Sequence, residues 1–146
     1  VTSIQDITST GQDGYRFLKL DGGMTEILRP SLYGAQHPLV VVPEPGQERF
    51  RENLDQVVVG HCCESGDLLT PVPRDPEVLA PRNLLRGEVG DFCVIEGVGA
   101  YCSSMSAKNY NSFPEAAEIL KKQDGTIAAI RKRQTFEQMV ENEVVP

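Results

Sequence analysis

The sequence lacks long apolar runs and has few positive charges, and each shortage excludes a class of protein. No apolar run approaches the roughly 20 residues that a membrane-spanning helix needs. The 14 lysine and arginine residues are outnumbered by 21 aspartate and glutamate residues, which leaves a formal net charge of −7. Nucleic acids and anionic membranes bind basic surfaces. We therefore expect no nucleic-acid partner and no membrane partner.

Cysteine and histidine are also scarce, and their spacing fits no standard metal site. The cysteines are Cys62, Cys63, Cys93 and Cys102. They contain no C-x-x-C pair and form no recognisable disulfide framework. We therefore expect that the protein binds no metal and that its thiols are free. Free thiols are typical of a reducing compartment, which predicts a cytoplasmic protein. With His37 and His61 as the only histidines, a catalytic triad is poorly supported.

Short apolar segments punctuated by glycine and proline predict strands. A chain of 146 residues suits one domain with a modest core, and we expect residues 1–146 to form it. Four segments are rich in aliphatic and aromatic residues, as strands are: 15–20, 38–42, 56–60 and 92–95. The charged residues 43–55 predict an exposed loop between two of these strands.

The C-terminal third predicts a hairpin and a short helix. Residues 115–122 are good helix formers, but Asp-Gly between two apolar runs is a strong hairpin signal. We therefore predict a first hairpin strand over residues 118–123 and a second over 126–131. Residues 135–138 match a capping box, which predicts a helix that ends near Glu141.

Prolines limit regular structure in two places. Pro30 excludes a continuous helix through Arg29, so we expect one helical turn over residues 31–33, with Arg29 and Tyr33 toward one face. The four prolines within residues 70–87 predict a long connection, with at most one helical turn near residues 83–86. Together the elements predict a mainly β protein, an antiparallel and Greek-key-like β barrel or sandwich with a short C-terminal helix.

Two segments carry side chains suited to chemistry. Residues 61–67 (His-Cys-Cys-Glu-Ser-Gly-Asp) follow the apolar strand 57–60, so a thiol and a carboxylate come where a strand ends. The alternative is a structural cysteine beside a solvated glutamate. Residues 97–106 are rich in glycine and hydroxyl groups, which suits a phosphate or carboxylate, but they lack the G-K-[ST] ending of a P-loop. This segment could equally be a glycine-rich turn.

Read in order, these motifs resemble the C-terminal part of the diaminopimelate decarboxylases. The resemblance rests on residues 29–33 (Arg-Pro-Ser-Leu-Tyr), 63–67 (Cys-Glu-Ser-Gly-Asp) and 99–101 (Gly-Ala-Tyr). Residues 21–24, 110–112 and 131–135 extend it over nearly the whole chain. The family belongs to the fold-type III enzymes, whose α/β barrel holds pyridoxal 5′-phosphate and whose β domain completes the active site.

The barrel motifs of that family are not in this sequence. None of the five lysines lies in the family's Schiff-base motif, and the glycine-rich phosphate loop and the Glu-Pro-Gly-Arg segment are missing. The chain also opens without a methionine. The resemblance therefore implies a β domain without its barrel, from a fragment or a processed product, that is inactive alone.

The resemblance also implies residue roles. Arg29 and Tyr33 are expected to bind the distal carboxylate of meso-diaminopimelate, and Glu64 its distal ammonium. Cys63 is the candidate acid that reprotonates the reacting carbon. Tyr101 is expected to contact the cofactor phosphate and to line the substrate site, although Cys102 stands where the family more often has glycine. The family is homodimeric, and its Cys-Glu segment enters the neighbour's active site.

Two alternatives stay open. The first is the β domain of a related ornithine- or arginine-type decarboxylase, although such enzymes lack the Glu-Ser-Gly form after the cysteine. It predicts no loss of function when Arg29 is replaced. The second is a stand-alone, non-catalytic module that binds a partner or a small anion.

Overall fold

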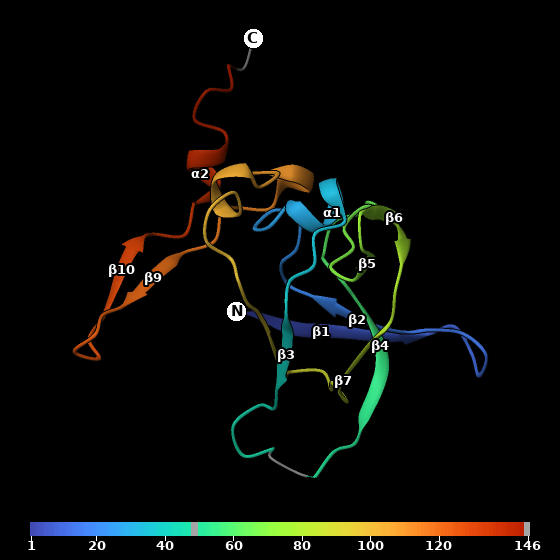
Figure 1. Cartoon of the computed structure of the whole chain (residues 1–146). Coiled ribbons are helices and arrows are strands. Elements are labelled where there is room, and N and C mark those ends of the chain that lie inside the picture. Colours follow the sequence, from blue (N-terminus) through green and yellow to red (C-terminus); the bar gives the residue numbers. More distant parts are fainter. Residues whose placement is uncertain (48–49, 145–146) are drawn as a thin grey trace.

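A nearly closed β barrel makes up most of the computed structural model, which describes residues 1–47 and 50–144 (Figure 1). Its strands are β1 (Thr2–Ser9), β2 (Arg16–Leu20), β3 (Leu39–Val42), β4 (Asn53–Val59), β7 (Arg82–Leu85) and β8 (Phe92–Ile95). They form a six-stranded sheet in the order β3-β8-β1-β2-β4-β7. Neighbouring strands are antiparallel except β2 and β4, which are parallel.

The sheet curls until its two edge strands meet. Arg82 at the start of β7 donates a hydrogen bond of 2.8 Å to the carbonyl of His37, just before β3. The core inside the curl contains Ile4, Leu18 and Val58, each fully buried, from three neighbouring strands. Burying one such side chain contributes about 1.5–3 kcal/mol. The expected mainly β barrel with a short C-terminal helix is confirmed.

The region with four prolines differs from the prediction. Residues 70–87 contain β5 (Pro71–Val72), β6 (Asp75–Leu79) and β7, and no helical turn lies at residues 83–86. Strands β5 and β6 pair only with each other, so Pro71 and Pro76 interrupt no wider hydrogen-bond ladder. Strand β7 pairs with β4 from Asn53↔Leu85 to Gln56↔Arg82. Tertiary pairing therefore creates strands where the local sequence predicts a connection.

Helix α1 (Arg29–Tyr33) begins earlier than expected. Proline is tolerated in the first helical turn because its missing N–H would have no partner there. Pro30 occupies that turn, so Arg29 belongs to the helix, and the expectation that Pro30 excludes it is wrong. Gly34 ends the helix at φ 61° and donates its N–H to the carbonyl of Pro30.

The other predictions agree with the structure in type, with small shifts at the boundaries. Strands β9 (Glu118–Lys121) and β10 (Ile127–Arg131) form the predicted hairpin, and α2 (Phe136–Met139) has the predicted capping box. The expected loop 43–55 is shorter, because β4 already begins at Asn53. Glu48 and Arg49, which belong to that prediction, lie outside the described residues.

Among the described helices, none has the length and apolar character to cross a lipid bilayer.

Candidate functional site

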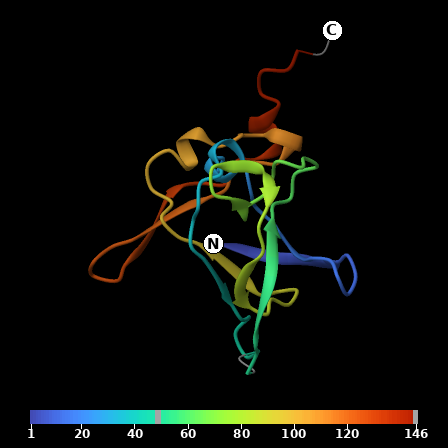
Figure 2. The same cartoon turned by 45° about the vertical axis from the view of Figure 1, so that its right-hand side comes forward.

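Three segments that are far apart in sequence gather at one end of the barrel. Figures 1 and 2 show α1 and the orange segment around residues 100–113 together at the upper end. The third segment, residues 61–67, directly follows β4, and we call it the Cys-Glu corner. The Cys-Glu corner is hydrogen-bonded to residues on both sides: the N–H of Met24 bonds to Asp67, and the N–H of Cys63 to Asn111.

A buried carboxylate, that of Asp67, holds the Cys-Glu corner together. Its two oxygens accept the N–H groups of Met24 at 2.7 Å and of Cys62 at 2.8 Å. The backbone carbonyl of Asp67 accepts the N–H of Gly60 at 2.9 Å. A Cβ atom on Gly60 or Gly23 would lie 2.2 or 2.3 Å from this carboxylate, so the site requires glycine at both positions. The sequence alone does not predict this role of Asp67. The signal that could have indicated it is the pair of glycines, Gly23 after β2 and Gly60 after β4.

Glu64 lies on the exposed side of the Cys-Glu corner. The N–H of Gly66 at 3.0 Å and the hydroxyl of Ser65 at 3.3 Å donate to it and lower the pKa of its carboxyl. The hydroxyl of Tyr110 is a further donor at 3.4 Å. Glu64 is therefore a carboxylate at neutral pH, ready to accept hydrogen bonds from a cation.

The two neighbouring cysteines have different surroundings. Burial, and then the negative charge of Asp67, raise the pKa of the Cys62 thiol to about 12, so it stays protonated at neutral pH. Cys63 is exposed, and its backbone N–H donates to the side-chain oxygen of Asn111 at 2.8 Å. Of the two thiols, that of Cys63 is therefore the more accessible to a ligand.

His61 anchors the Cys-Glu corner through a ring stack and a hydrogen bond. Its ring stacks on Phe113, with ring centroids 3.6 Å apart and an angle of 5° between the planes. Its Nε2 lies 2.7 Å from the hydroxyl oxygen of Thr25, and the hydroxyl proton of Thr25 is donated to Glu26 at 2.6 Å. The imidazole therefore ties the end of β4 to residues 24–26 and to the segment that follows Tyr110.

The predicted residues form two groups at this end of the barrel. Cys63 and Glu64 share the Cys-Glu corner, and Glu64 lines a groove of about 740 Å³ together with Cys62. Arg29 and Tyr33 lie one helical turn apart on α1 and do not line this groove. Within the described residues, the guanidinium of Arg29 and the hydroxyl of Tyr33 have no hydrogen-bond partner. No hydrogen bond or ion pair between described residues joins the side chains of the two groups.

Tyr101 stands apart, 65% exposed, in the glycine-rich segment. Its φ is 62°, a left-handed conformation, and Cys102 beside it is buried. Its exposed hydroxyl can donate to an anion such as a phosphate. Lys19, which lines the groove, is paired with Asp6 at 2.7 Å. Among the described residues that line this groove, no lysine is without an ion-pair partner.

Comparison with known proteins places these features in context. The sequence model described as "Pyridoxal-dependent decarboxylase, C-terminal sheet domain" matches residues 1–99. A diaminopimelate decarboxylase of Buchnera aphidicola subsp. Baizongia pistaciae is 38% identical over 129 residues, which is 88% of this chain and 30% of that protein.

Solved structures agree with the sequence matches. A crystal structure of diaminopimelate decarboxylase superposes with a TM-score of 0.83 at 31% identity and covers 96% of this chain and 32% of that one. The enzyme from M. jannaschii in complex with L-lysine has a TM-score of 0.78 at 29% identity, over 99% of this chain and 29% of that one. The chain therefore spans about a third of the length of the proteins it matches.

Proposed function

This chain belongs to the family of C-terminal sheet domains of pyridoxal-dependent decarboxylases, and from that premise we propose that residues 1–146 are the β domain of a diaminopimelate decarboxylase. With a barrel domain, the enzyme would convert meso-2,6-diaminopimelate to L-lysine and CO2; the β domain alone would be inactive. The observation that carries this proposal is the ionised Glu64 beside an exposed Cys63 on the Cys-Glu corner. The similarity to proteins named diaminopimelate decarboxylase supports it.

The substrate explains why both groups of residues are needed. Its unreacted end carries an ammonium and a carboxylate. The ammonium requires an acceptor, which Glu64 provides, and the carboxylate requires donors, which Arg29 and Tyr33 provide. All three side chains have hydrogen-bonding capacity to spare. A substrate that lacks the distal carboxylate would leave Arg29 unmatched, which favours diaminopimelate over ornithine or arginine.

The remaining roles concern the cofactor and the proton. Pyridoxal 5′-phosphate, when bound, supplies the electron sink for decarboxylation. Tyr101 would donate its hydroxyl to the phosphate and line the substrate site. Cys63 would hold a proton on Sγ and transfer it to the carbon that loses CO2. The lysine that binds the aldehyde would come from the barrel domain.

We further propose a cytoplasmic homodimer with an active site shared across the interface. Cys63 and Glu64 are exposed, as groups that act in a neighbouring subunit's site must be. The four cysteines are all free, which is compatible with a reducing compartment.

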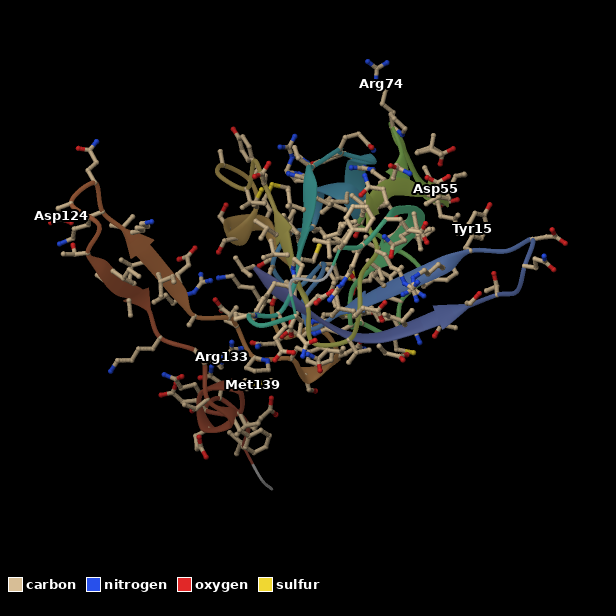
Figure 3. All side chains as sticks on the ribbon, turned by 90° about the horizontal axis from the view of Figure 1, so that it is seen from below. Tyr15, Asp55, Arg74, Asp124, Arg133 and Met139 are labelled. Atoms are coloured by element: carbon tan, nitrogen blue, oxygen red, sulfur yellow. The ribbon has the colours of Figure 1, made fainter. Side chains whose placement is uncertain are left out.

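The test uses the full-length enzyme that carries this domain. We expect Arg29→Met to raise KM for diaminopimelate by about tenfold or more, because a charge-assisted pair is lost. The control is Arg74→Met, since Arg74 extends into solvent at the tip between β5 and β6 (Figure 3). An unchanged KM, or a preference for ornithine or arginine, would overturn the proposal that diaminopimelate is the substrate. No decarboxylation of any of these amino acids would favour a non-catalytic binding module.

A further inference from the structure

The segment from Asn109 to Ser112, which we call the strap, has an unusual backbone. Three of its four residues are left-handed without being glycine: Asn109 at φ 59°, Asn111 at φ 50° and Ser112 at φ 62°. Side chains disfavour this region, and asparagine tolerates it best. Such a run persists where surrounding contacts impose it, and it is typical of functional sites.

One end of the strap is fixed to the C-terminal region by a pair of side-chain amides. Asn109 donates to the Oε1 atom of Gln134 at 2.5 Å, and Gln134 donates back to Oδ1 of Asn109 at 3.3 Å. Gln134 also exchanges two hydrogen bonds with the backbone of Glu115, at 3.0 and 3.1 Å. A second bond from Asn109, to the carbonyl of Phe113 at 3.0 Å, links the first residue of the strap to the residue that follows it. The strap is therefore anchored independently of the Cys-Glu corner.

The other end of the strap reaches the Cys-Glu corner. The Oδ1 atom of Asn111 accepts the N–H of Cys63 at 2.8 Å, and the hydroxyl of Tyr110 donates to Glu64 at 3.4 Å. Cys63 and Glu64 are adjacent and exposed, so their own side-chain packing does little to fix them. Because Cβ directions follow the backbone, a bond to the Cys63 amide orients both side chains together.

From this geometry we infer that Asn111 is a positioning residue for Cys63 and Glu64, and that the Asn109–Gln134 amide pair holds Asn111 in place. The inference rests on the proposed function, because it assigns the thiol and the carboxylate a shared task. It goes beyond that function by giving the strap a role: the strap orients the thiol of Cys63 and the carboxylate of Glu64 toward the same substrate. Losing Asn111 should then affect proton transfer and distal ammonium binding together.

The test separates the side-chain acceptor from the backbone conformation. In the full-length enzyme, Asn111→Gly relieves the left-handed strain but removes the acceptor, whereas Asn111→Asp keeps an acceptor oxygen. We expect Asn111→Gly and Asn111→Ala each to lower kcat and raise KM, with kcat/KM reduced by about tenfold or more. Asn111→Asp should recover most of kcat. The matched control is Asn83→Ala, an exposed asparagine that donates to Asp55 on the neighbouring strand.

A second measurement does not depend on activity. Hydrogen exchange at the Cys63 amide should accelerate by about fivefold or more in Asn111→Gly and Asn111→Ala, since the N–H loses its acceptor. It should accelerate less in Gln134→Ala, which loosens the anchor but leaves Asn111. If the wild-type enzyme decarboxylates no amino acid, the proposed function fails, while this exchange still tests the strap.

Two results would overturn the inference. One is full activity and unchanged Cys63 exchange in Asn111→Gly, which would show that the side-chain oxygen is dispensable. The other is an equal rise in exchange throughout the β domain in Asn111→Gly, which would mean that Asn111 serves general stability. If Asn111→Ala fails to fold, the glycine and aspartate variants still decide between these outcomes.

Discussion

Two acidic residues of the Cys-Glu corner, three positions apart, have opposite environments. Asp67 is 2% exposed and accepts two backbone N–H groups, whereas Glu64 is exposed and keeps acceptor capacity. The difference comes from the backbone: Gly23 and Gly60 leave room for one carboxylate, and the turn at Gly66 directs the other outward. One acid therefore shapes the loop, and the other is available to a ligand.

The buried acid should be sensitive to a single-atom change. In Asp67→Asn, one oxygen becomes an NH2 group that cannot accept the N–H of Met24 or Cys62. Leaving one buried donor unsatisfied should lower the free energy of unfolding by about 1–3 kcal/mol. Urea denaturation of this chain measures the loss. The control, Asp55→Asn, changes an exposed carboxylate and should cost less than about 0.5 kcal/mol; equal losses would contradict the role of Asp67.

The exposed acid should keep its charge to a lower pH than an ordinary glutamate does. Because donors from Gly66 and Ser65 lower the pKa of Glu64 from its ordinary value, the ionised carboxylate favours folding at a pH above that ordinary value. This contribution is lost only as the pH falls through the lower, folded-state pKa. We expect Ser65→Ala to move the pKa of Glu64 upward in a carbon-13 NMR titration. Ser104→Ala should leave it in place, and an unaltered titration in Ser65→Ala would refute the assignment.

The two adjacent thiols should react at different rates. Burial and Asp67 raise the pKa of Cys62 to about 12, and burial raises that of Cys93 to about 11, so both stay protonated at pH 8. Iodoacetamide reacts with thiolates. We expect peptide mapping by mass spectrometry to find Cys63, the exposed thiol, labelled first. Labelling of Cys62 before Cys63 would contradict this, with denatured protein as the control for equal access.

At the scale of elements, the sequence predicts what local patterns determine. Apolar runs and turn residues predict β8 at residues 92–95 and the β9–β10 hairpin, and both are present. Strand β7 has no such local pattern. It forms because it pairs with β4, which lies almost thirty residues away in the sequence. The same distinction between local and distant information applies to the residues of the candidate site. Motif spacing indicates Cys63 and Glu64, but Asn111 is seen as a partner of Cys63 only in the folded chain.

A buried side chain in β4 shows how that distant pairing is held. Gln56 is fully buried, donates to the carbonyls of Leu84 and Leu85, and accepts from Gly87 and Arg16. Gln56→Ala would leave several of these groups without partners, so we expect a loss of about 2–4 kcal/mol in the free energy of unfolding. Thermal and urea denaturation measure it. Gln123→Ala, in the exposed hairpin turn, is the control, and a similar small loss in both variants would argue against a role for Gln56.

Considered as a whole, the molecule has a well-packed barrel and a projecting hairpin with little packing of its own. In Figure 1 the β9–β10 hairpin extends to one side of the barrel. Its aliphatic side chains Ile119, Ile127 and Ile130 are 69%, 67% and 60% exposed, and Phe136 of α2 is 71% exposed. Exposed apolar side chains favour association with another surface.

We therefore expect this chain to self-associate through the hairpin when it is studied alone. Light scattering across a concentration series should show an average mass that rises above that of the monomer. Ile119→Thr combined with Ile127→Thr keeps β-branched residues in the strands but reduces the apolar surface, so the mass should return toward the monomer. Val78→Thr on β6 removes a single exposed aliphatic group far from the hairpin in sequence and should change little. A monomer at every concentration would show that the hairpin does not drive association, and equal effects of the hairpin and β6 variants would place the contact elsewhere.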